Sequence, residues 1–336
     1  MEFPENDIDI PIMKSSNLLP TYHFAHLVDD HLMRTTHVIR GQEWVSSVPI
    51  HHELFKTFGF KLPKYVHTPL ILKKDGDKIR KISKRLDPEA RMTYYEEKGY
   101  PVYSVIEAIM TIANSNFEAW RESHPEAPFT EFEFSPKKMS ASGALFDLDK
   151  LDNISKNYIS KLKATEVFDM LDTWSKEYDK DFNDLINKYK EYTIEVLNIE
   201  REQKKPRKDY ASLSEIKGQI WYMYDELFTD VTYEFDERFT KEDINEVLTT
   251  YFNEFYDDND DKDTWFNKMK ELTDKLGYCS NMKEYKENPD NYKGNVADIS
   301  NIIRVGVTSK SQTPDLYIIL KLLGKDRIVE RISKIK

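Results

Sequence analysis

Cysteine is almost absent from this chain of 336 residues: Cys279 stands alone, which excludes an internal disulfide and any zinc site built from several cysteines. No apolar run reaches the roughly 18 residues that a membrane-spanning helix needs, and no basic-then-apolar leader opens the chain. Glycine is scarce as well, with 10 residues, which fits a largely helical chain. We therefore expect a cytoplasmic protein that does not act at a membrane and holds no zinc.

The charge balance is acidic overall but uneven along the chain. Hydrophobic residues make up 39% and charged residues 32% of the sequence, as in soluble globular proteins, and the length suits two or three domains. The formal net charge is −11, whereas nucleic-acid binders are usually basic. Residues 73–85 and 204–208 are nevertheless basic, and residues 255–263 are acidic. Because the local field governs binding, the net charge does not exclude a nucleic-acid partner.

The first third of the chain has the pattern of an α/β fold. Residues 8–14 alternate in a way that predicts a strand, and residues 35–41 predict a short buried strand. Apolar residues at helical spacing follow over 45–60, and a second strand is predicted over 67–72. A strand, a helix and a strand within about 40 residues form a βαβ unit, which indicates a parallel sheet.

From about residue 100 the pattern is helical. Residues 102–113 predict one helix, and residues 165–189 predict a longer one with a single apolar face. A third helix is predicted over 313–325, with Thr313 as its cap and Gly324 as its stop. The fold class is therefore an α/β segment followed by an all-α segment.

Seven of the 8 histidines lie in the first fifth of the chain, and four of them share residues 21–44 with Asp29 and Asp30. One interpretation is a metal site, but no H-x-x-x-H occurs in that stretch to pair ligands on one helix face. The other is that the histidines are partly buried partners of Asp29, Asp30 and backbone groups. The spacing favours the second interpretation, and no metal site is predicted.

Arg40 is a stronger functional candidate. It follows an apolar strand and precedes Gly41, so it lies at the carboxyl end of a strand, where open α/β sheets bind ligands. An arginine there can hold a carboxylate through two parallel hydrogen bonds. An ordinary surface ion pair would give the same sequence. Trp44 could form the wall of such a pocket, or simply belong to the core.

Residues 81–85, KISKR, form a third feature together with Lys78 and Arg80. Five cations surround one serine just after a glycine-containing loop, and they would repel one another unless they faced an anion. Polyphosphate is the obvious anion, since lysines bind phosphate as mobile point charges. A solvated basic loop is the alternative, and the K-x-S-K pattern favours phosphate.

KISKR resembles the KMSKS loop of class I aminoacyl-tRNA synthetases, in the variant with a terminal arginine that is common in the glutamyl branch. Residues 19–60 closely resemble the second half of the glutamyl-tRNA synthetase catalytic domain. Residues 142–159 look like the stem-contact segment of that family, and residues 301–332 look like its anticodon-binding end. The chain is thus identified as a relative of the glutamyl-tRNA synthetases over nearly its whole length.

The resemblance implies three regions and an activity. We expect the carboxyl half of a Rossmann-like catalytic domain over 1–98, a stem-contact region over 99–160 and a helical anticodon-binding domain over 161–336. The implied activity is glutamate–tRNA ligation through glutamyl-adenylate, with ATP and its Mg²⁺ and with glutamate and tRNA(Glu) as partners. Charging of tRNA(Gln) stays open.

The resemblance also assigns residues. Glutamate or its adenylate is expected at four side chains: Tyr22, His26, Arg40 and Trp44. The catalytic loop contributes Lys81, Ser83 and Lys84, and ATP is expected to meet Lys81, Lys84 and Arg85. tRNA is expected at five cations: Lys204, Lys205, Arg207, Arg304 and Lys310.

Two departures from the family limit the expected activity. The second class I signature, HIGH, has no counterpart, because no H-x-G-H occurs in these 336 residues. Residues 16–20, SNLLP, stand where the family usually has S-D-G-x-P, so Asn17 and Leu18 replace an Asp-Gly turn. We therefore expect an N-terminally truncated form, which would need a separate N-terminal half as partner. The alternative is a non-catalytic tRNA-binding module derived from the enzyme.

Overall fold

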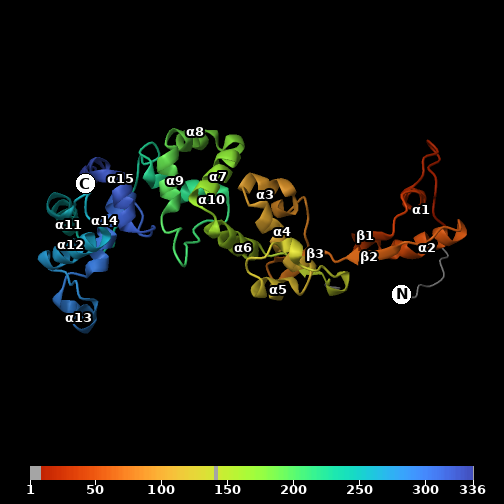
Figure 1. Ribbon diagram of the computed structural model, residues 1–336, viewed down its shortest axis with the longest axis horizontal. Helices are drawn as coiled ribbons and strands as arrows, with labels where there is room; N and C mark the ends of the chain where they lie inside the picture. Colours follow the sequence, from red (N-terminus) through yellow and green to blue (C-terminus); the bar gives the residue numbers. More distant parts are fainter. Residues whose placement is uncertain (1–8, 140–142, 336) are drawn as a thin grey trace. The chain divides into compact units, whose positions relative to one another are not determined.

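The computed structural model describes residues 9–139 and 143–335, and Figure 1 shows its elements in chain order. The chain divides into two compact units. Unit 1 comprises residues 1–95 and 102–154, and unit 2 comprises residues 96–101 and 155–336. Within the described residues, no helix is both long and apolar enough to cross a membrane.

The predicted βαβ motif is confirmed at the start of unit 1. Strand β1 (His37–Gly41) pairs in parallel with β2 (Lys64–Thr68), and helix α2 (Val48–Thr57) connects them. Helix α1 (Tyr22–Leu32) packs on α2, and its apolar face is buried there. A 3-10 turn over Gln42–Ser47 leads from the end of β1 into α2.

Two strand predictions were wrong. The strand predicted over 67–72 is divided, because β2 ends at Thr68 and β3 (Ile71–Asp75) begins a different sheet. Pro69 lies at the break, where it has no N–H to offer to a strand partner.

Residues 9–14 form no strand, whereas residue 8 lies outside the described residues. Pro11 interrupts the segment, and its pairing is limited to an isolated bridge from Met13 to Pro20. The turn that follows needs a left-handed residue, and Leu18 supplies it with φ 55°. Leucine thus occupies the position where the family commonly has glycine.

The second sheet of unit 1 has the order β4-β3-β5. Strand β4 (Lys78–Lys81) forms an antiparallel hairpin with β3, and β5 (Ala144–Leu145) pairs with β3 in parallel. The hairpin carries the basic residues from Lys73 to Lys81, and Lys84 and Arg85 lie in the loop that follows it. Helix α4 (Val102–Ala113) has the predicted bounds, and the neighbouring helices are α3 (Met92–Lys98), α5 (Phe117–Ser123) and α6 (Leu148–Lys161).

Unit 2 is helical. Its helices are α7 (Ala164–Tyr178), α8 (Lys180–Lys188), α9 (Lys190–Asn198), α10 (Leu213–Ile220), α11 (Lys241–Thr250), α12 (Lys262–Lys275), α13 (Met282–Glu287), α14 (Val296–Thr308) and α15 (Leu316–Ser333). Their apolar faces share one core, in which side chains such as Leu171, Ile216 and Ile303 are fully buried.

The single helix predicted over 165–189 is two helices, α7 and α8. The chain turns at Asp179, which has φ −150° and ψ 75°, and its side chain accepts a hydrogen bond from the Phe182 N–H to cap α8. The apolar face continues across this break, because Leu171 and Phe182 are both buried. The predicted apolar face is therefore correct, whereas the helix cap at Asp179, which divides that face between two helices, was not predicted.

The last helix begins later than predicted, whereas its predicted stop at Gly324 is found. Asp315, not Thr313, caps α15, because its side chain accepts from the Ile318 N–H over 3.2 Å. Gly324 has φ 73° and interrupts the helix, which then resumes and ends at Ser333. The first helical segment therefore stops at Gly324, and a second segment that was not predicted follows the kink.

Candidate functional site

Arg40 lies at the carboxyl end of β1 with its guanidinium held by neutral groups. Its Nε donates to Nε2 of His67 over 3.2 Å, and its Nη1 donates to Nδ1 of His51 over 3.2 Å. Its Nη2 donates to the backbone oxygen of Trp44 over 3.2 Å. Arg40 forms no ion pair with any carboxylate of residues 9–139 or 143–335. The interpretation of Arg40 as half of a surface ion pair therefore finds no support.

Aromatic side chains surround this guanidinium. The Cζ atom of Arg40 lies 5.0 Å from the ring centre of Tyr65 and 5.9 Å from that of Trp44. The rings of Tyr22 and Trp44 lie 4.5 Å apart, and Tyr22 is 47% exposed. The fold thus brings together three of the four residues predicted for glutamate, Tyr22, Arg40 and Trp44, at one open edge.

His26, the fourth, is buried behind them. Its Nδ1 lies 2.5 Å from Oδ2 of Asp30, and its Nε2 lies 2.9 Å from the hydroxyl of Tyr65. Burial lowers the pKa of His26, and the Asp30 carboxylate opposes that shift. Because both ring nitrogens are already engaged, His26 shapes the wall rather than presenting a free nitrogen.

The histidine cluster makes direct contacts among its own members. Nδ1 of His23 lies 2.9 Å from Nε2 of His51, and the ring of His26 lies 4.3 Å from that of His51. The predicted pairing with Asp30 is found at His26, whereas the main partners of His51 and His67 are ring and guanidinium nitrogens. The described part of the chain contains no group of three His, Cys, Asp or Glu side chains that could hold a metal ion.

The KISKR loop lies next to the end of β1. Nζ of Lys81 is 3.8 Å from Oε1 of Glu43, a residue of the turn that follows Arg40. An open cavity of about 700 Å³ is lined by Lys81, Lys84, Glu43 and Gly41. Its remaining walls are mainly apolar, with Leu70, Ile82, Ile112, Met139 and Phe146 among them. The sequence pattern had already placed this loop and Arg40 as candidates, and the fold makes them neighbours.

Asp87 and Glu89 are the residues that sequence reasoning missed at this loop. Asp87 is 2% exposed and accepts from Nη1 and Nη2 of Arg80 over 2.7 and 2.8 Å. It also accepts from the backbone N–H of Ser83 over 2.8 Å, while Lys73 pairs with Glu89. The hydrogen bonds from Arg80 hold the pKa of Asp87 well below its usual range. The sequence over 73–89 contains carboxylates among its cations, and this mixture could have indicated ion pairs within the loop.

Ser83 and Arg85 complete the loop. The backbone N–H of Arg85 donates to Oγ of Ser83 over 3.4 Å, so the serine stabilises the turn through its own side chain as well as its N–H. The Arg85 side chain and that of Lys84 are exposed. Ser83 therefore orients the loop, and the cations beside it face solvent.

Arg304 and Lys310, two of the five cations predicted for tRNA, donate to backbone oxygens within unit 2. Nη1 of Arg304 donates to the backbone oxygens of Thr313 and Pro314 over 3.2 and 2.9 Å, and burial lowers its pKa. Nζ of Lys310 donates to the backbone oxygen of Gly218 over 2.8 Å. Arg304 also lines a polar hollow with Arg207, Ser300, Asn301 and Gln312.

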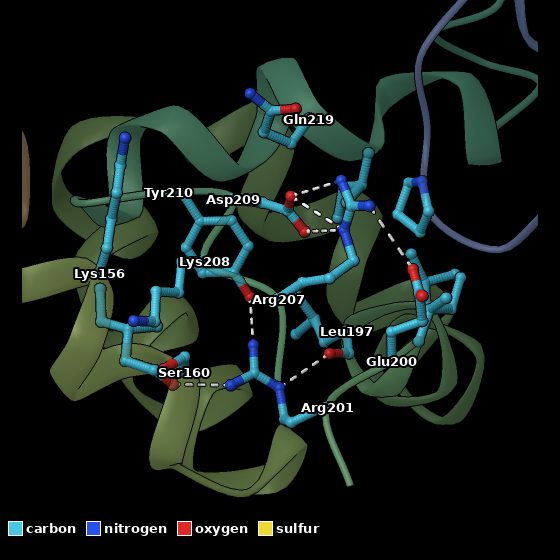
Figure 2. Close-up of a pocket in the computed structure, with 15 residues that line it drawn as sticks. Lys156, Ser160, Leu197, Glu200, Arg201, Arg207, Lys208, Asp209, Tyr210 and Gln219 are labelled. Carbon is cyan, nitrogen blue, oxygen red and sulfur yellow. Dashed lines mark hydrogen bonds and ion pairs between the residues drawn. The ribbon is translucent and has the colours of Figure 1, made fainter. Parts of the chain in front are cut away.

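The basic segment 204–208 divides into exposed and paired residues. Lys204 and Lys205 are exposed. Arg207 contacts both oxygens of Asp209, the shortest distance being 2.7 Å, and lies 3.6 Å from Glu200, as Figure 2 shows. The cations of this segment therefore differ, and Lys204 and Lys205 carry most of its uncompensated charge.

Arg201, beside this segment, acts as a clamp. Its Nε donates to the backbone oxygen of Leu197, its Nη1 to that of Ile159, and its Nη2 to the hydroxyl of Tyr210 over 2.6 Å (Figure 2). These bonds tie the ends of α6 and α9 to the segment that precedes α10. They connect the two ends of the basic segment to α6 and α9.

Two family models match the chain. The model described as tRNA synthetases class I (E and Q), catalytic domain, matches residues 1–153. The model described as anticodon binding domain matches residues 205–336. These matches confirm the predicted order of an α/β catalytic segment and a helical C-terminal segment.

Several curated proteins are similar over almost the whole chain. The glutamate–tRNA ligase of Clostridium perfringens strain 13 is 47% identical over 335 residues, which are 99% of this chain and 61% of that protein. The glutamate–tRNA ligase of Acetivibrio thermocellus is 46% identical over 97% of this chain and 59% of that protein. The chain spans about three fifths of the length of these relatives.

A solved structure agrees on the fold. A glutamate tRNA ligase from Elizabethkingia meningosepticum, in complex with its amino acid, matches with a TM-score of 0.65 at 19% identity over 97% of this chain and 62% of that one. At this identity the likeness concerns the fold. The two family models and the relatives near 47% identity go further: residues 1–153 are a region of the catalytic domain of class I tRNA synthetases (E and Q), and residues 205–336 are an anticodon-binding domain.

Proposed function

We propose that this chain carries the amino-acid site, the phosphate-binding loop and the tRNA-binding region of a glutamate–tRNA ligase. In that reaction the α-carboxylate of glutamate attacks the α-phosphorus of ATP, forming glutamyl-adenylate and releasing pyrophosphate. The acyl group then passes to a hydroxyl of the terminal adenosine of tRNA(Glu), and AMP leaves. A protein with this activity works beside the ribosome, so we assign it to the cytoplasm.

One observation carries the proposal. Arg40 has no carboxylate partner among the described residues. Glu43 follows it by three residues, and Nζ of Lys81 lies 3.8 Å from Oε1 of Glu43. A cation suited to a carboxylate and a cation suited to phosphate therefore meet at one strand end. Adenylate formation needs those two groups side by side.

The roles follow from the contacts. Arg40 binds a carboxylate of glutamate, while Tyr22 and Trp44 form the wall against its methylenes. His26 supports that wall through Tyr65. This assignment uses polar groups that would be left unpaired without the ligand, which favours a charged amino acid over an apolar one.

The phosphate side uses the basic loop. Lys81, Lys84 and Arg85 are exposed and would neutralise the phosphates of ATP, which arrives with its Mg²⁺. Ser83 keeps the turn of the loop. No role for zinc is proposed.

The tRNA side uses unit 2. We propose that Lys204, Lys205 and Arg207 contact the tRNA backbone and that Arg304 and Lys310 lie at the anticodon end. The regions would be a catalytic part over 1–98, a stem-contact part over 99–160 and an anticodon-binding part over 161–336. The cognate tRNA is tRNA(Glu), and tRNA(Gln) is the second substrate to test.

The test is glutamate-dependent ATP–pyrophosphate exchange in the presence of tRNA(Glu). We expect no exchange by the 336-residue chain alone, because it contains no H-x-G-H to grip the α-phosphate. We expect exchange when a fragment with the N-terminal residues of the Clostridium perfringens relative is added. A matched chain with Lys81→Ala and Lys84→Ala should lose it. Equal exchange by that variant would contradict the phosphate assignment.

The second candidate is a non-catalytic tRNA-binding module, and the missing H-x-G-H favours it. Under this alternative the chain binds tRNA(Glu), yet the added N-terminal fragment restores no exchange. Binding of tRNA is measured in the same samples, so the two candidates give different pairs of results.

A further inference from the structure

The histidines around Arg40 have an arrangement that the proposed function does not require in itself. Three different elements each supply one neutral acceptor to the guanidinium: His67 from β2, His51 from α2, and the Trp44 carbonyl from the turn between β1 and α2. Arg40 and His67 are also direct partners in the parallel register, so their side chains leave the same face of the sheet. The orientation of Arg40 is thus fixed on three sides.

A guanidinium has five N–H groups, one on Nε and two on each terminal nitrogen. Three of them are engaged here, one on each nitrogen, so one N–H remains on Nη1 and one on Nη2. A carboxylate can accept both in the parallel geometry that arginine prefers. The contacts that orient the side chain therefore leave one donor on each terminal nitrogen for a carboxylate.

The acceptors also leave the charge available. An arginine is usually fixed by a carboxylate, which would cancel the charge that a second carboxylate has to meet. His51 is 1% exposed, and burial with the nearby His26 and Arg40 lowers its pKa to about 3. Burial and the Arg40 charge lower the pKa of His67 as well. Both rings are therefore neutral acceptors at neutral pH, and a cation stays uncompensated among aromatic rings.

We infer that His51 and His67 are positioning residues that determine specificity: they orient the guanidinium of Arg40 without neutralising it, and so reserve its charge for the side-chain carboxylate of the amino acid. The identity of that amino acid rests on the proposed function. The bracing itself is a property of this chain. The two can be tested separately.

The bracing is tested by NMR on the full chain labelled with ¹⁵N-arginine, with the Arg40 signal identified by its loss in Arg40→Lys. We expect the Arg40 Nε–H to exchange slowly with water in the unchanged chain and at least about tenfold faster in His67→Leu, because that N–H loses its acceptor. His67→Gln should restore slow exchange, since its Oε1 can replace Nε2 as the acceptor. The same exchange rate in His67→Leu as in the unchanged chain would overturn the bracing.

His51 provides a second route, with its exposed neighbour His52 as the matched control. In the unchanged chain, the bond to His51 should make rotation of the Arg40 terminal nitrogens slow. His51→Asn keeps a neutral acceptor near the position of Nδ1 and should preserve this slow rotation, whereas His51→Leu removes the acceptor and should make the rotation faster. His52→Leu should change nothing. Thermal unfolding of each variant shows whether the fold persists, and the His67 variants decide the matter if His51→Leu does not fold.

Specificity is tested by calorimetric titration with L-glutamate and with L-glutamine. His51→Asp places a carboxylate against Arg40 and should weaken glutamate binding roughly tenfold or more, with a smaller effect on glutamine. His52→Asp, with the same change of charge at the surface, should leave the ratio of the two affinities unaltered. An unaltered ratio in His51→Asp would overturn the specificity role. Failure of the unchanged chain to bind glutamate would count against the proposed function, while the NMR result still decides the bracing.

Discussion

Arg80 and Asp87 form a bidentate ion pair in which Nη1 donates to Oδ2 over 2.7 Å and Nη2 donates to Oδ1 over 2.8 Å. The same carboxylate accepts from the backbone N–H of Ser83 over 2.8 Å. The buried carboxylate of Asp87 thus links Arg80, at the start of the basic loop, to Ser83, in its middle. Because Arg80 is neutralised there, the positive charge that faces the cavity comes from Lys81, Lys84 and Arg91.

This pair predicts that Asp87→Asn loosens the loop. The substitution removes a charge that two donors share, so the loop should open more often and trypsin should cleave after Lys81, Lys84 or Arg85 roughly tenfold faster. Limited proteolysis followed by mass spectrometry measures the rate at each bond. Asp77→Asn, in the exposed hairpin turn, is the control and should leave the rate unchanged. Equal rates in the two variants would show that the pair does not hold the loop.

The buried His51 predicts a pH dependence of the stability of unit 1. Its pKa is lowered from 6.5 to about 3, so between these values the unfolded chain binds a proton that the folded protein does not. Stability should therefore fall as the pH is lowered from 6.5 towards 3, by up to about 1.4 kcal/mol per pH unit for this group. Urea unfolding at pH 7 and pH 5 measures the difference.

His51→Asn should reduce that difference, because asparagine does not titrate yet keeps a neutral acceptor. Part of the dependence should persist, since the pKa values of His26 and His67 are also lowered. His52→Asn, at an exposed position, should leave the pH dependence as it is. A full pH dependence in His51→Asn would mean that His51 is not buried in its neutral form.

Gly99 has φ 72°, and a Cβ at this position would lie 2.7 Å from Cβ of Leu213 and 2.9 Å from Cδ1 of Trp174. Gly99→Ala should therefore destabilise unit 2 by about 1–3 kcal/mol, because the left-handed backbone and the packing both resist a methyl group. Gly218→Ala is the matched control, since a Cβ there meets nothing within 4 Å and the residue lies inside α10. That variant should gain about 0.5–1 kcal/mol. Urea unfolding of both variants tests the contrast, and a loss no larger in Gly99→Ala than in Gly218→Ala would contradict it.

Local patterns predicted the parts of the fold that local physics decides. Helix α4 has the predicted bounds, and β1, α2 and β2 occur in the predicted order, because alternation and helical periodicity are properties of neighbouring residues. The division at Asp179 and the helical segment after Gly324 were missed, since an apolar stripe continues through both. Caps and left-handed residues change the backbone without changing that stripe.

The candidate site likewise has one part that the sequence predicted and another part that it did not. The sequence identified Arg40 and the KISKR loop as candidates, because a strand end and a charge run are visible in a single stretch. It could not predict that His67 and His51 would hold Arg40, since they lie 27 and 11 residues away. His67 meets Arg40 through the register of β1 and β2, whereas His51 reaches it from α2. Long-range pairing of this kind is decided by the packed fold.

The exposed lysines of the basic segment predict how tRNA binding depends on salt. Lys204 and Lys205 have exposed side chains, whereas Arg207 is paired with Asp209. If the two lysines contact phosphates, changing both to alanine should weaken binding of tRNA(Glu) and of an unrelated tRNA alike. It should also lower the slope of log affinity against log salt by about 1–2, because fewer counterions are released.

Filter binding of the full chain at several salt concentrations measures that slope. The control is the double variant Lys283→Ala and Lys286→Ala, which removes two lysines from exposed positions of α13. The two double variants therefore have the same net charge. A general electrostatic attraction would weaken equally in both variants, because each loses two positive charges. Direct phosphate contacts at the basic segment would change the slope in the Lys204 and Lys205 variant alone. An unchanged slope there would mean that the segment is a solvated linker, and tRNA would have to bind elsewhere on unit 2.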